Sequence, residues 1–315
     1  MSKIAFIYPG QGAQKAGMGA DFYENSEIAR YIFDQAGEEL DLDMKELCFE
    51  ENDRLDLTEY TQAAMVTTCL AMTRVAESKG LKADITAGLS LGEYPAIAAA
   101  GGMNDMDAIR LVRKRGILMQ NTVPAGEGAM CAVISMAAEE IEKVIEPIAD
   151  VSVANYNCPG QIVITGKTDA VEEAAAKLKE AGARRTIMLN VSGPFHSQML
   201  VPAGEKLAEE LEHTRFHELR IPYVTNVTAE KVTDIRETPG LLTTQISSPV
   251  RWMQSMERMI ADGVDTFVEI GPGKTLEGFL RKIDRSVKVF HISQWEDVDK
   301  VCEELVDGGN RMEES

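Results

Sequence analysis

The sequence predicts an α/β protein with a mostly parallel sheet and a second, smaller unit inserted into the chain. Two observations support this prediction: buried-strand patterns alternate with helix patterns along most of the sequence, and residues 125–192 change to the order βαββαβ. Strands that alternate with helices form parallel sheets covered on both faces. We therefore expect a large core from residues 1–124 and 193–307, a subdomain over 125–192 and a frayed polar tail over 308–315.

The composition is that of an ordinary globular enzyme, because 44% of the 315 residues are hydrophobic and 26% are charged. The net charge of −19 argues against nucleic-acid binding, which needs a basic surface. No stretch is long enough to cross a bilayer, and the N-terminal apolar run Ile4–Tyr8 is too short for a signal peptide. The five cysteines are scattered without a CxxC pair, so we expect neither disulfides nor a metal site, and we predict a cytoplasmic protein.

The first strand is predicted over residues 3–8, where a compact apolar run is typical of a buried strand. The glycine-rich loop that follows, Pro9–Gln14, lacks the G-x-G-x-x-G spacing of a dinucleotide site, so we interpret it as a loop whose backbone approaches a ligand. Helix patterns then cover 26–40 and 58–78. The second pattern is apolar on nearly all sides, which indicates a buried helix, and Gly80 ends it.

Residues 83–100 form the stretch around which we expect the rest of the chain to be arranged. A short strand over 85–87 leads into a Gly-x-Ser-x-Gly turn over 88–92, and an alanine-rich helix follows. This order is typical of a nucleophile elbow, in which glycines let backbones approach and the hydroxyl of Ser90 stands at the end of a strand. The N–H of Leu91, at the helix start, would point at the atom that the serine attacks. The alternative is a glycine-rich turn with a solvated serine.

The next helix is predicted over residues 105–123, and it carries a cluster of positive side chains. These are Arg110, Arg113, Lys114 and Arg115. Because the cluster is so short, at about 3.6 residues per turn its members cannot share one face of a helix. We expect Arg115 to point inward, beside the apolar residues that follow it, and the other three side chains to face water.

The predicted subdomain and the returning core supply the remaining elements. The subdomain has a strand over 130–135, a helix over 137–148, strands over 151–156 and 161–165, a helix over 169–181 and a strand over 184–189. This order is the split arrangement of ferredoxin-like units. The returning core has helices over 199–213, 241–246, 253–261 and 294–306 and strands over 223–226, 266–270 and 287–292.

A catalytic serine needs a base, and the chain has only four histidines. His213 and His217 lie in a charged stretch and are expected to be solvated, whereas His291 lies in the last predicted strand and is expected to be structural. His196 follows a Gly-Pro turn and precedes a helix, the kind of loop position where catalytic residues concentrate, so it is the candidate base for Ser90. No acid lies near it in sequence, so a distant acid or a carbonyl would have to orient the imidazole. The alternative is a histidine without a catalytic role.

Several short motifs follow one another along the chain. They are PGQGAQ at 9–14, GLSLGE at 88–93, Arg-x-x-x-Met at 115–119, NCPGQ at 157–161, GPFH at 193–196 and EIGPG at 269–273. In this combination and order the chain resembles the malonyl-CoA:acyl carrier protein transacylases, an acyltransferase family of fatty acid and polyketide synthesis. The resemblance runs from residue 4 to about residue 292. It implies an α/β-hydrolase-like core with a small ferredoxin-like subdomain, in agreement with the order of elements.

The resemblance also implies a covalent mechanism, with Ser90 as the nucleophile and His196 as its general base and acid. It implies that the backbone N–H groups of Gln11 and Leu91 form the oxyanion hole. In the same way, it implies that Arg115 binds the free carboxylate of a malonyl group, so that an acetyl group would leave a buried charge unpaired.

Four further residues are implied to support the site: Gln62, Met119, Phe195 and Gln245. Gln62 matches a polar residue of the acyl pocket, and Gln245 matches the segment whose carbonyl orients the catalytic histidine. Leu89 departs from the family, which most often has histidine just before the nucleophile. We expect catalysis to survive this difference, because the side chain is not part of the catalytic pair Ser90 and His196. We expect the polarity of the pocket mouth to change.

Malonyl-CoA and an acyl carrier protein are the partners that the resemblance implies. The enzyme would need no cofactor of its own, because coenzyme A arrives with the substrate and phosphopantetheine belongs to the carrier. Acyl carrier proteins are acidic and this chain carries a charge of −19, so we predict that a local basic patch binds the carrier. The candidate residues are Arg110, Arg113, Lys114, Lys274, Arg281, Lys282 and Arg285.

Three alternatives stay open at this point. A serine hydrolase or thioesterase could use the same elbow, although it needs no buried arginine. A non-catalytic carrier-binding protein is the second, and the presence of both Ser90 and His196 argues against it. The third is a transacylase that serves polyketide rather than fatty acid synthesis, which the sequence does not separate; Phe195 resembles the malonyl-using form of the family, not the methylmalonyl-using form.

Overall fold

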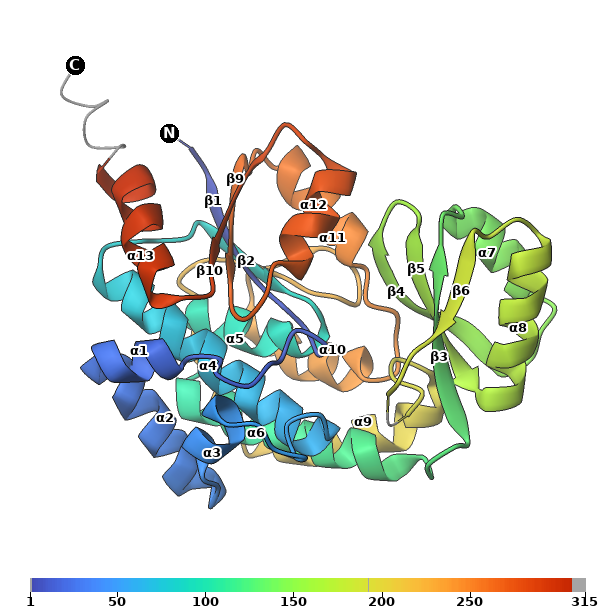
Figure 1. Ribbon diagram of the computed structural model, residues 1–315, viewed down its shortest axis with the longest axis horizontal. Helices are drawn as coiled ribbons and strands as arrows, with labels where there is room; N and C mark the ends of the chain where they lie inside the picture. Colours follow the sequence, from blue (N-terminus) through green and yellow to red (C-terminus); the bar gives the residue numbers. More distant parts are fainter. Residues whose placement is uncertain (1, 192, 308–315) are drawn as a thin grey trace.

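Residues 2–191 and 193–307 are described by the computed structural model, and they form two lobes (Figure 1). The larger lobe contains a six-stranded sheet with helices on both faces, and the smaller lobe contains a four-stranded sheet with two helices. This arrangement confirms the predicted α/β fold class with an inserted βαββαβ unit. The predicted tail over 308–315 lies outside the described residues.

The large sheet is parallel except at one edge. Its strands are β1 (Ile4–Tyr8), β2 (Ile85–Gly88), β7 (Tyr223–Val224), β8 (Lys231–Val232), β9 (Thr266–Ile270) and β10 (Lys288–Ile292). They lie in the order β10-β9-β1-β2-β7-β8, and β8 alone is antiparallel to its neighbour. Because the carboxyl ends of parallel strands share one edge, the loops that follow β1, β2, β7 and β9 meet there, which is where α/β sheets bind ligands.

The helices of the large lobe follow most of the predicted patterns. They are α1 (Ala20–Asn25), α2 (Glu27–Leu40), α3 (Met44–Phe49), α4 (Thr58–Ser78), α5 (Glu93–Ala99), α6 (Asp105–Thr122), α9 (Val201–Glu212), α10 (Thr238–Gln245), α11 (Trp252–Ala261), α12 (Thr275–Ile283) and α13 (Trp295–Cys302). The sequence did not predict α1, α3 or β8, because elements this short show too little periodicity. The predicted helix over 294–306 changes after Cys302 into a π-helical turn, Glu303–Asp307. No helix in the described ranges is both long and apolar enough to span a membrane.

Strand β1 shows how the sheet is buried on both faces. Phe6 and Tyr8 belong to the same core cluster as residues of α4 and α5, whereas Ala5 and Ile7 belong to the cluster that contains residues of α11 and α12. Successive side chains of a strand point to opposite faces, so this alternation places a helical layer on each side. All four side chains are buried, which explains the continuous apolar run in the sequence.

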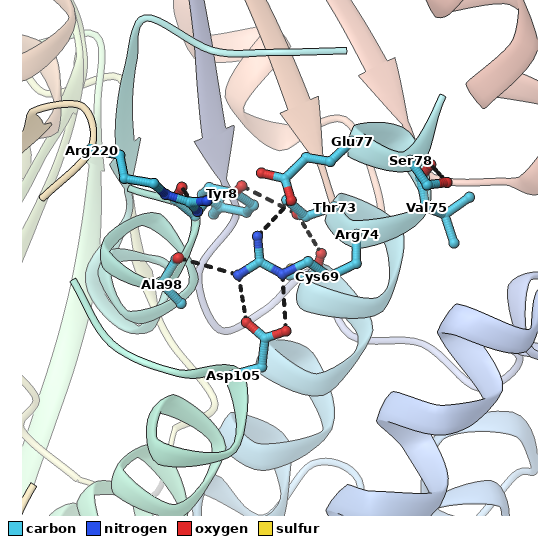
Figure 2. A network of polar contacts seen from close by, with 11 residues as sticks. Tyr8, Cys69, Thr73, Arg74, Val75, Glu77, Ser78, Ala98, Asp105 and Arg220 are labelled. Carbon is cyan, nitrogen blue, oxygen red and sulfur yellow. Dashed lines mark hydrogen bonds and ion pairs between the residues drawn. The ribbon is translucent and has the colours of Figure 1, made fainter. Parts of the chain in front are cut away.

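An arginine network joins three helices of the large lobe (Figure 2). Arg74 of α4 makes two hydrogen bonds, of 2.6 and 2.9 Å, to the carboxylate of Asp105 at the start of α6, and it donates to the main-chain oxygen of Ala98 in α5 at 3.2 Å. Glu77 accepts a further bond from the same guanidinium at 2.6 Å. The helix that follows the serine turn is thereby held against the helix that carries Arg115.

The smaller lobe packs one face of its sheet against the large lobe. Its elements are β3 (Gly128–Ile134), α7 (Ala138–Ile145), β4 (Val151–Cys158), β5 (Gln161–Lys167), α8 (Thr168–Glu180) and β6 (Arg185–Met188), with the antiparallel strand order β4-β5-β3-β6. Helices α7 and α8 cover one face. From the other face, Met130 and Val163 belong to the core cluster of the large lobe. The N–H of Tyr156 also donates to the carbonyl oxygen of Val250 at 2.9 Å, which ties the two lobes together.

Candidate active site

The serine turn lies at the carboxyl end of β2 and has no room for side chains on its flanking glycines. A Cβ atom on Gly88 would lie 1.8 Å from the carbonyl oxygen of Gly92, and one on Gly92 would lie 2.4 Å from that of Tyr8. Ser90 itself adopts a left-handed backbone conformation, with φ of 55°. Non-glycine residues in that conformation are strained and concentrate at functional sites. The strand, turn and helix therefore have the geometry of a nucleophile elbow, in which the side chain stands out from a tight bend.

His196 lies directly beside the serine hydroxyl. Its Nε2 atom is 2.8 Å from Ser90 Oγ, and its Nδ1 atom is 2.9 Å from the carbonyl oxygen of Gln245. Because a carbonyl only accepts, Nδ1 carries the proton and Nε2 is free to accept one from the serine. A main-chain carbonyl therefore holds the imidazole, which is one of the two possibilities left open by the sequence. Burial, and then the positive charge of Arg115, lower the pKa of His196 to about 4, so the ring is neutral near pH 7.

Arg115 points inward, as predicted, and is fully buried. Its guanidinium donates to Gln62 Oε1 at 2.8 Å, to Ser90 Oγ at 3.0 Å and to Gln245 Oε1 at 3.1 Å. These acceptors are neutral, and its Nε atom has no hydrogen-bond partner. In the described part of the chain no carboxylate lies within ion-pair distance of Arg115, and burial lowers its pKa. A buried cation whose hydrogen-bond partners are all neutral, 3.0 Å from a nucleophile, is suited to bind an anionic ligand.

A cavity of about 240 Å³ opens beside these groups, between the two lobes. The other predicted site residues lie on its wall or behind it. The cavity is lined by Ser90, His196 and Arg115 and by five further predicted residues: Gln11, Gln62, Leu91, Met119 and Phe195. Gln245 lies behind the wall and contacts His196. Leu89, at the position where the family most often has histidine, is also on the wall. The smaller lobe contributes Met130, Asn155 and Val163, and α12 contributes Leu276 and Phe279.

Two buried residues of the site had no predicted role. Asn226 accepts a hydrogen bond from the main-chain N–H of Ser90 at 2.7 Å and donates to the carbonyl oxygen of Gly88 at 2.7 Å, so it holds both sides of the turn. Because Asn226 bonds to the serine turn, it is not part of β7, which ends at Val224 and not at the predicted residue 226. Glu93, the last residue of the GLSLGE motif, is buried beneath the serine, and burial raises its pKa to about 7. A polar residue at the carboxyl end of a predicted strand was the available signal for Asn226.

The other histidines lie outside the site. His213 is exposed, as predicted, but His217 is half-buried and its Nε2 atom is buried. The prediction of a solvated ring is wrong for His217, because its main-chain N–H bonds to the carbonyl oxygen of Gly102 at 2.8 Å and brings the segment against the core. His291 lies between two carboxylates, of Glu277 at 3.7 Å and Asp297 at 3.9 Å. In the described ranges no three His, Cys, Asp or Glu side chains are grouped to hold a metal ion.

The predicted basic residues form two groups, because α6 and α12 pack on opposite sides of the large sheet (Figure 1). On α6, Arg110, Arg113 and Lys114 are paired with nearby carboxylates. The prediction that all three face water is wrong for Arg113, which is half-buried because it donates to the main-chain oxygen of Glu59 at 2.6 Å. On and next to α12, Arg281 pairs with Glu277. Lys274, Lys282 and Arg285 are exposed, and among the described residues no ion pair is seen for them. The α12 group is the one that borders the cavity, through Leu276 and Phe279.

Comparison with known proteins places this site in a family. The acyl transferase domain family matches residues 5–296. The malonyl CoA-acyl carrier protein transacylase of Bacillus subtilis (strain 168) is 44% identical over 310 residues, which is 97% of this chain and 98% of that protein. The crystal structure of the enzyme of that name from Clostridium perfringens is 42% identical and superposes with a TM-score of 0.95 over 99% of this chain and 100% of that one. A malonyl-transacylase solved in complex with a type II polyketide synthase acyl carrier protein is 36% identical, with a TM-score of 0.93 over 96% of this chain and 99% of that one.

Proposed function

The chain belongs to the acyl transferase family, and on this premise we propose that it transfers the malonyl group of malonyl-CoA to the thiol of an acyl carrier protein. One observation carries the proposal beyond the family resemblance. The hydroxyl of Ser90 is 2.8 Å from the base His196 and 3.0 Å from the buried guanidinium of Arg115, so a nucleophile and a carboxylate-binding group face one cavity. That pairing suits an acyl donor with a free carboxylate at its far end.

In the first half-reaction, Ser90 Oγ attacks the thioester carbonyl and His196 Nε2 takes its proton. The negative charge that develops on the carbonyl oxygen is stabilised by backbone N–H groups of Gln11 and Leu91, which line the same cavity. When the tetrahedral intermediate collapses, the C–S bond breaks and His196 returns its proton to the thiolate of coenzyme A. The product is a malonyl ester of Ser90 and free coenzyme A.

The second half-reaction reverses these roles with a different thiol. The pantetheine thiol of the carrier loses its proton to His196 and attacks the ester carbonyl, and the C–O bond to Ser90 breaks as the serine oxygen regains the proton. Because a thioester is already activated, this chemistry calls for no metal or redox cofactor. The kinetics are ping-pong.

Arg115 accounts for the choice of acyl group. A malonyl carboxylate accepts two parallel hydrogen bonds from a guanidinium, and it replaces the neutral acceptors that surround Arg115 in the free protein. An acetyl group would fill part of the cavity and leave the cation without a counter-ion. Leaving a buried charge unpaired typically costs about 3–5 kcal/mol, which exceeds what shape alone discriminates.

The experiment that tests this function is mass spectrometry of the intact protein after brief exposure to malonyl-CoA. We expect a malonyl adduct on Ser90 that persists without a thiol acceptor and disappears when a carrier protein bearing phosphopantetheine is added. The Ser90→Ala variant is the control and should form no adduct. Rapid release of malonate in the absence of any acceptor would instead identify a hydrolase.

For the carrier, we propose that it docks along α12 and the residues at its two ends. Lys274, Lys282 and Arg285 are the exposed basic residues without ion pairs among the described residues there, and the helix that they accompany lines the cavity. Reversing the charge of Lys282 should raise the KM for the carrier and leave the KM for malonyl-CoA unchanged. The matched control is reversal of Lys114, which is paired with Glu210 on the other side of the sheet and should change neither.

The proposed pathway is fatty acid synthesis, as the family naming implies, and the proposed location is the cytoplasm. A relative that is 36% identical was solved in complex with a type II polyketide synthase acyl carrier protein, which favours polyketide synthesis as the second candidate pathway. Comparing kcat/KM for a fatty acid carrier and a polyketide carrier with the same malonylated enzyme would separate these two roles.

A further inference from the structure

Gln245 contacts three residues of the site, Ser90, His196 and Arg115. Its main-chain oxygen accepts from His196 Nδ1, and its side-chain Oε1 accepts from Arg115 at 3.1 Å. The other end of the same side chain, Nε2, donates to the carbonyl oxygen of Ser90 at 3.0 Å and to Glu93 Oε2 at 2.7 Å. The direction in which this amide points therefore decides whether Arg115 meets an acceptor or a donor.

Glu93 provides the shortest of three hydrogen bonds that fix that direction, the other two being to the main-chain oxygen of Ser90 and to Asn226 Oδ1 at 3.3 Å. Glu93 Oε2 accepts from the NH₂ end of the Gln245 amide at 2.7 Å, and an oxygen that acts as an acceptor cannot face the oxygen end of that amide. The same Glu93 Oε2 atom also accepts from the main-chain N–H of Asn226 at 3.0 Å, which fixes the position of the carboxylate. The side chain of Asn226 in turn accepts from the N–H of Ser90. Glu93 is thus connected to Arg115 through one amide and to the nucleophile through another.

The burial of Glu93 needs an explanation beyond stability. Its side chain is fully buried, its second oxygen, Oε1, has no hydrogen-bond partner, and no ion pair to it exists in the described part of the chain. Burying a carboxylate without an ion-pair partner is costly even with hydrogen bonds from Asn226, Gln245 and Thr225, and an apolar residue of similar size would pack more favourably. The electrostatic interaction between Glu93 and Arg115 lowers the pKa of the first and raises that of the second, so each favours the charged form of the other.

We propose that Glu93 is a positioning residue for the transfer reaction, and this inference rests on the malonyl transfer proposed above. Its carboxylate holds the Gln245 amide with the oxygen toward Arg115, and it thereby keeps the guanidinium in place for the carboxylate of the acyl group. His196 depends on Gln245 through a main-chain oxygen, so it is less affected. Glu93 therefore acts mainly on the preference for malonyl over acetyl groups.

The Glu93→Gln variant is the main test, because glutamine has nearly the same shape and removes the negative charge that faces the Gln245 NH₂ group and favours the charged form of Arg115. We expect kcat/KM for acylation by malonyl-CoA to fall ten- to a hundredfold, and kcat/KM for acetyl-CoA to change less than threefold. The malonyl-to-acetyl ratio then falls at least tenfold. Glu93→Ala removes the hydrogen bonds from Asn226 and Gln245 and should lower the malonyl-to-acetyl ratio further. The ratio of the Gln variant should therefore lie between those of the Ala variant and the unmodified protein.

The matched control is Glu269→Gln. Glu269 is another fully buried glutamate, and it accepts from the main-chain N–H groups of Leu276 and Glu277 at 3.1 and 2.8 Å, away from Gln245. This variant should lower the melting temperature and leave the malonyl-to-acetyl ratio within twofold. The fraction of active sites in each sample is obtained from the amplitude of the malonyl burst, so that loss of folded protein is not mistaken for loss of selectivity.

Equal losses for both acyl groups in Glu93→Gln would overturn the inference and assign Glu93 a purely structural role. An unchanged ratio in both Glu93 variants would do the same. Failure of the proposed function looks different, because the unmodified protein would then form no malonyl adduct at all.

Discussion

Replacing Arg115 by alanine tests the central electrostatic argument. The guanidinium is fully buried, and around it in the free protein are the neutral oxygens of Gln62, Ser90 and Gln245. A malonyl carboxylate buried in the variant would face no cation, at a cost of about 3–4 kcal/mol for a broken buried pair. At about 1.4 kcal/mol per factor of ten, kcat/KM for malonyl-CoA should fall roughly 150- to 1,000-fold. For acetyl-CoA, which has no carboxylate to pair, it should stay within threefold.

The assay is the rate at which the adduct on Ser90 forms, followed by intact mass spectrometry with each acyl-CoA in turn. The same variant removes a cation that lowers the pKa of His196, so the acid limb of its acylation rate should also move to higher pH. A comparable loss of kcat/KM for both acyl-CoA substrates would refute the reasoning. It would mean that Arg115 supports the reactivity of Ser90 and does not select the acyl group. Circular dichroism and melting temperature show whether the variant is folded.

The remaining predictions concern the base, two glycines and Asn226. The pKa of His196, lowered from 6.5 to about 4, keeps the base neutral, so kcat/KM for malonyl-CoA should stay level down to about pH 5 and fall only near pH 4; a midpoint near 6.5 contradicts this. Between pH 6.5 and about pH 4, His196 binds a proton in the unfolded chain but not in the folded protein. The free energy of unfolding should therefore decrease as the pH falls from 6.5 toward 4. Gly88→Ala places a Cβ atom 1.8 Å from the carbonyl oxygen of Gly92 and should destabilise the fold by about 3 kcal/mol or more in urea denaturation. Gly278→Ala, with nothing within 4 Å of the added atom in α12, should instead stabilise it by up to about 1 kcal/mol. Asn226→Ala leaves the nucleophile's N–H without its acceptor and should lower kcat at least tenfold with little change in KM for malonyl-CoA; a lower melting temperature with unchanged kcat would contradict a positioning role.

The long elements of the fold were predictable because their patterns are local. The helix over 58–78 was predicted with the observed bounds, since its apolar residues cover nearly the whole surface of a continuous helix. The strand before the serine and the βαββαβ order of the inserted unit were also recognisable, because each depends on neighbouring residues in the chain. Helices α1 and α3 were missed, since each has too few residues to show a period.

The candidate site divides along the same line. Motif order pointed to Ser90, His196 and Arg115, and the inward direction of Arg115 followed from the crowding of positive charges on one helix. Their distances did not follow from the sequence, because the serine lies 106 residues before the histidine and the contact exists only once the sheet has formed. The sequence also did not predict that the basic residues of α6 and α12 lie on opposite sides of the sheet, since this depends on which face each helix covers.

The sequence by itself determined the fold class, the elbow and the choice of nucleophile and base, because glycine spacing, hydrophobic period and residue type act over a few neighbouring positions. The tertiary structure confirmed the carbonyl of Gln245 as the partner of His196, which residue spacing had left open and the family resemblance implied, and only the tertiary structure placed Asn226 and Glu93 beside the serine turn. These contacts join residues more than 40 positions apart or depend on which end of an amide faces a neighbour. Such interactions are set by how the sheet and helices pack, and packing is a property of the folded chain as a whole.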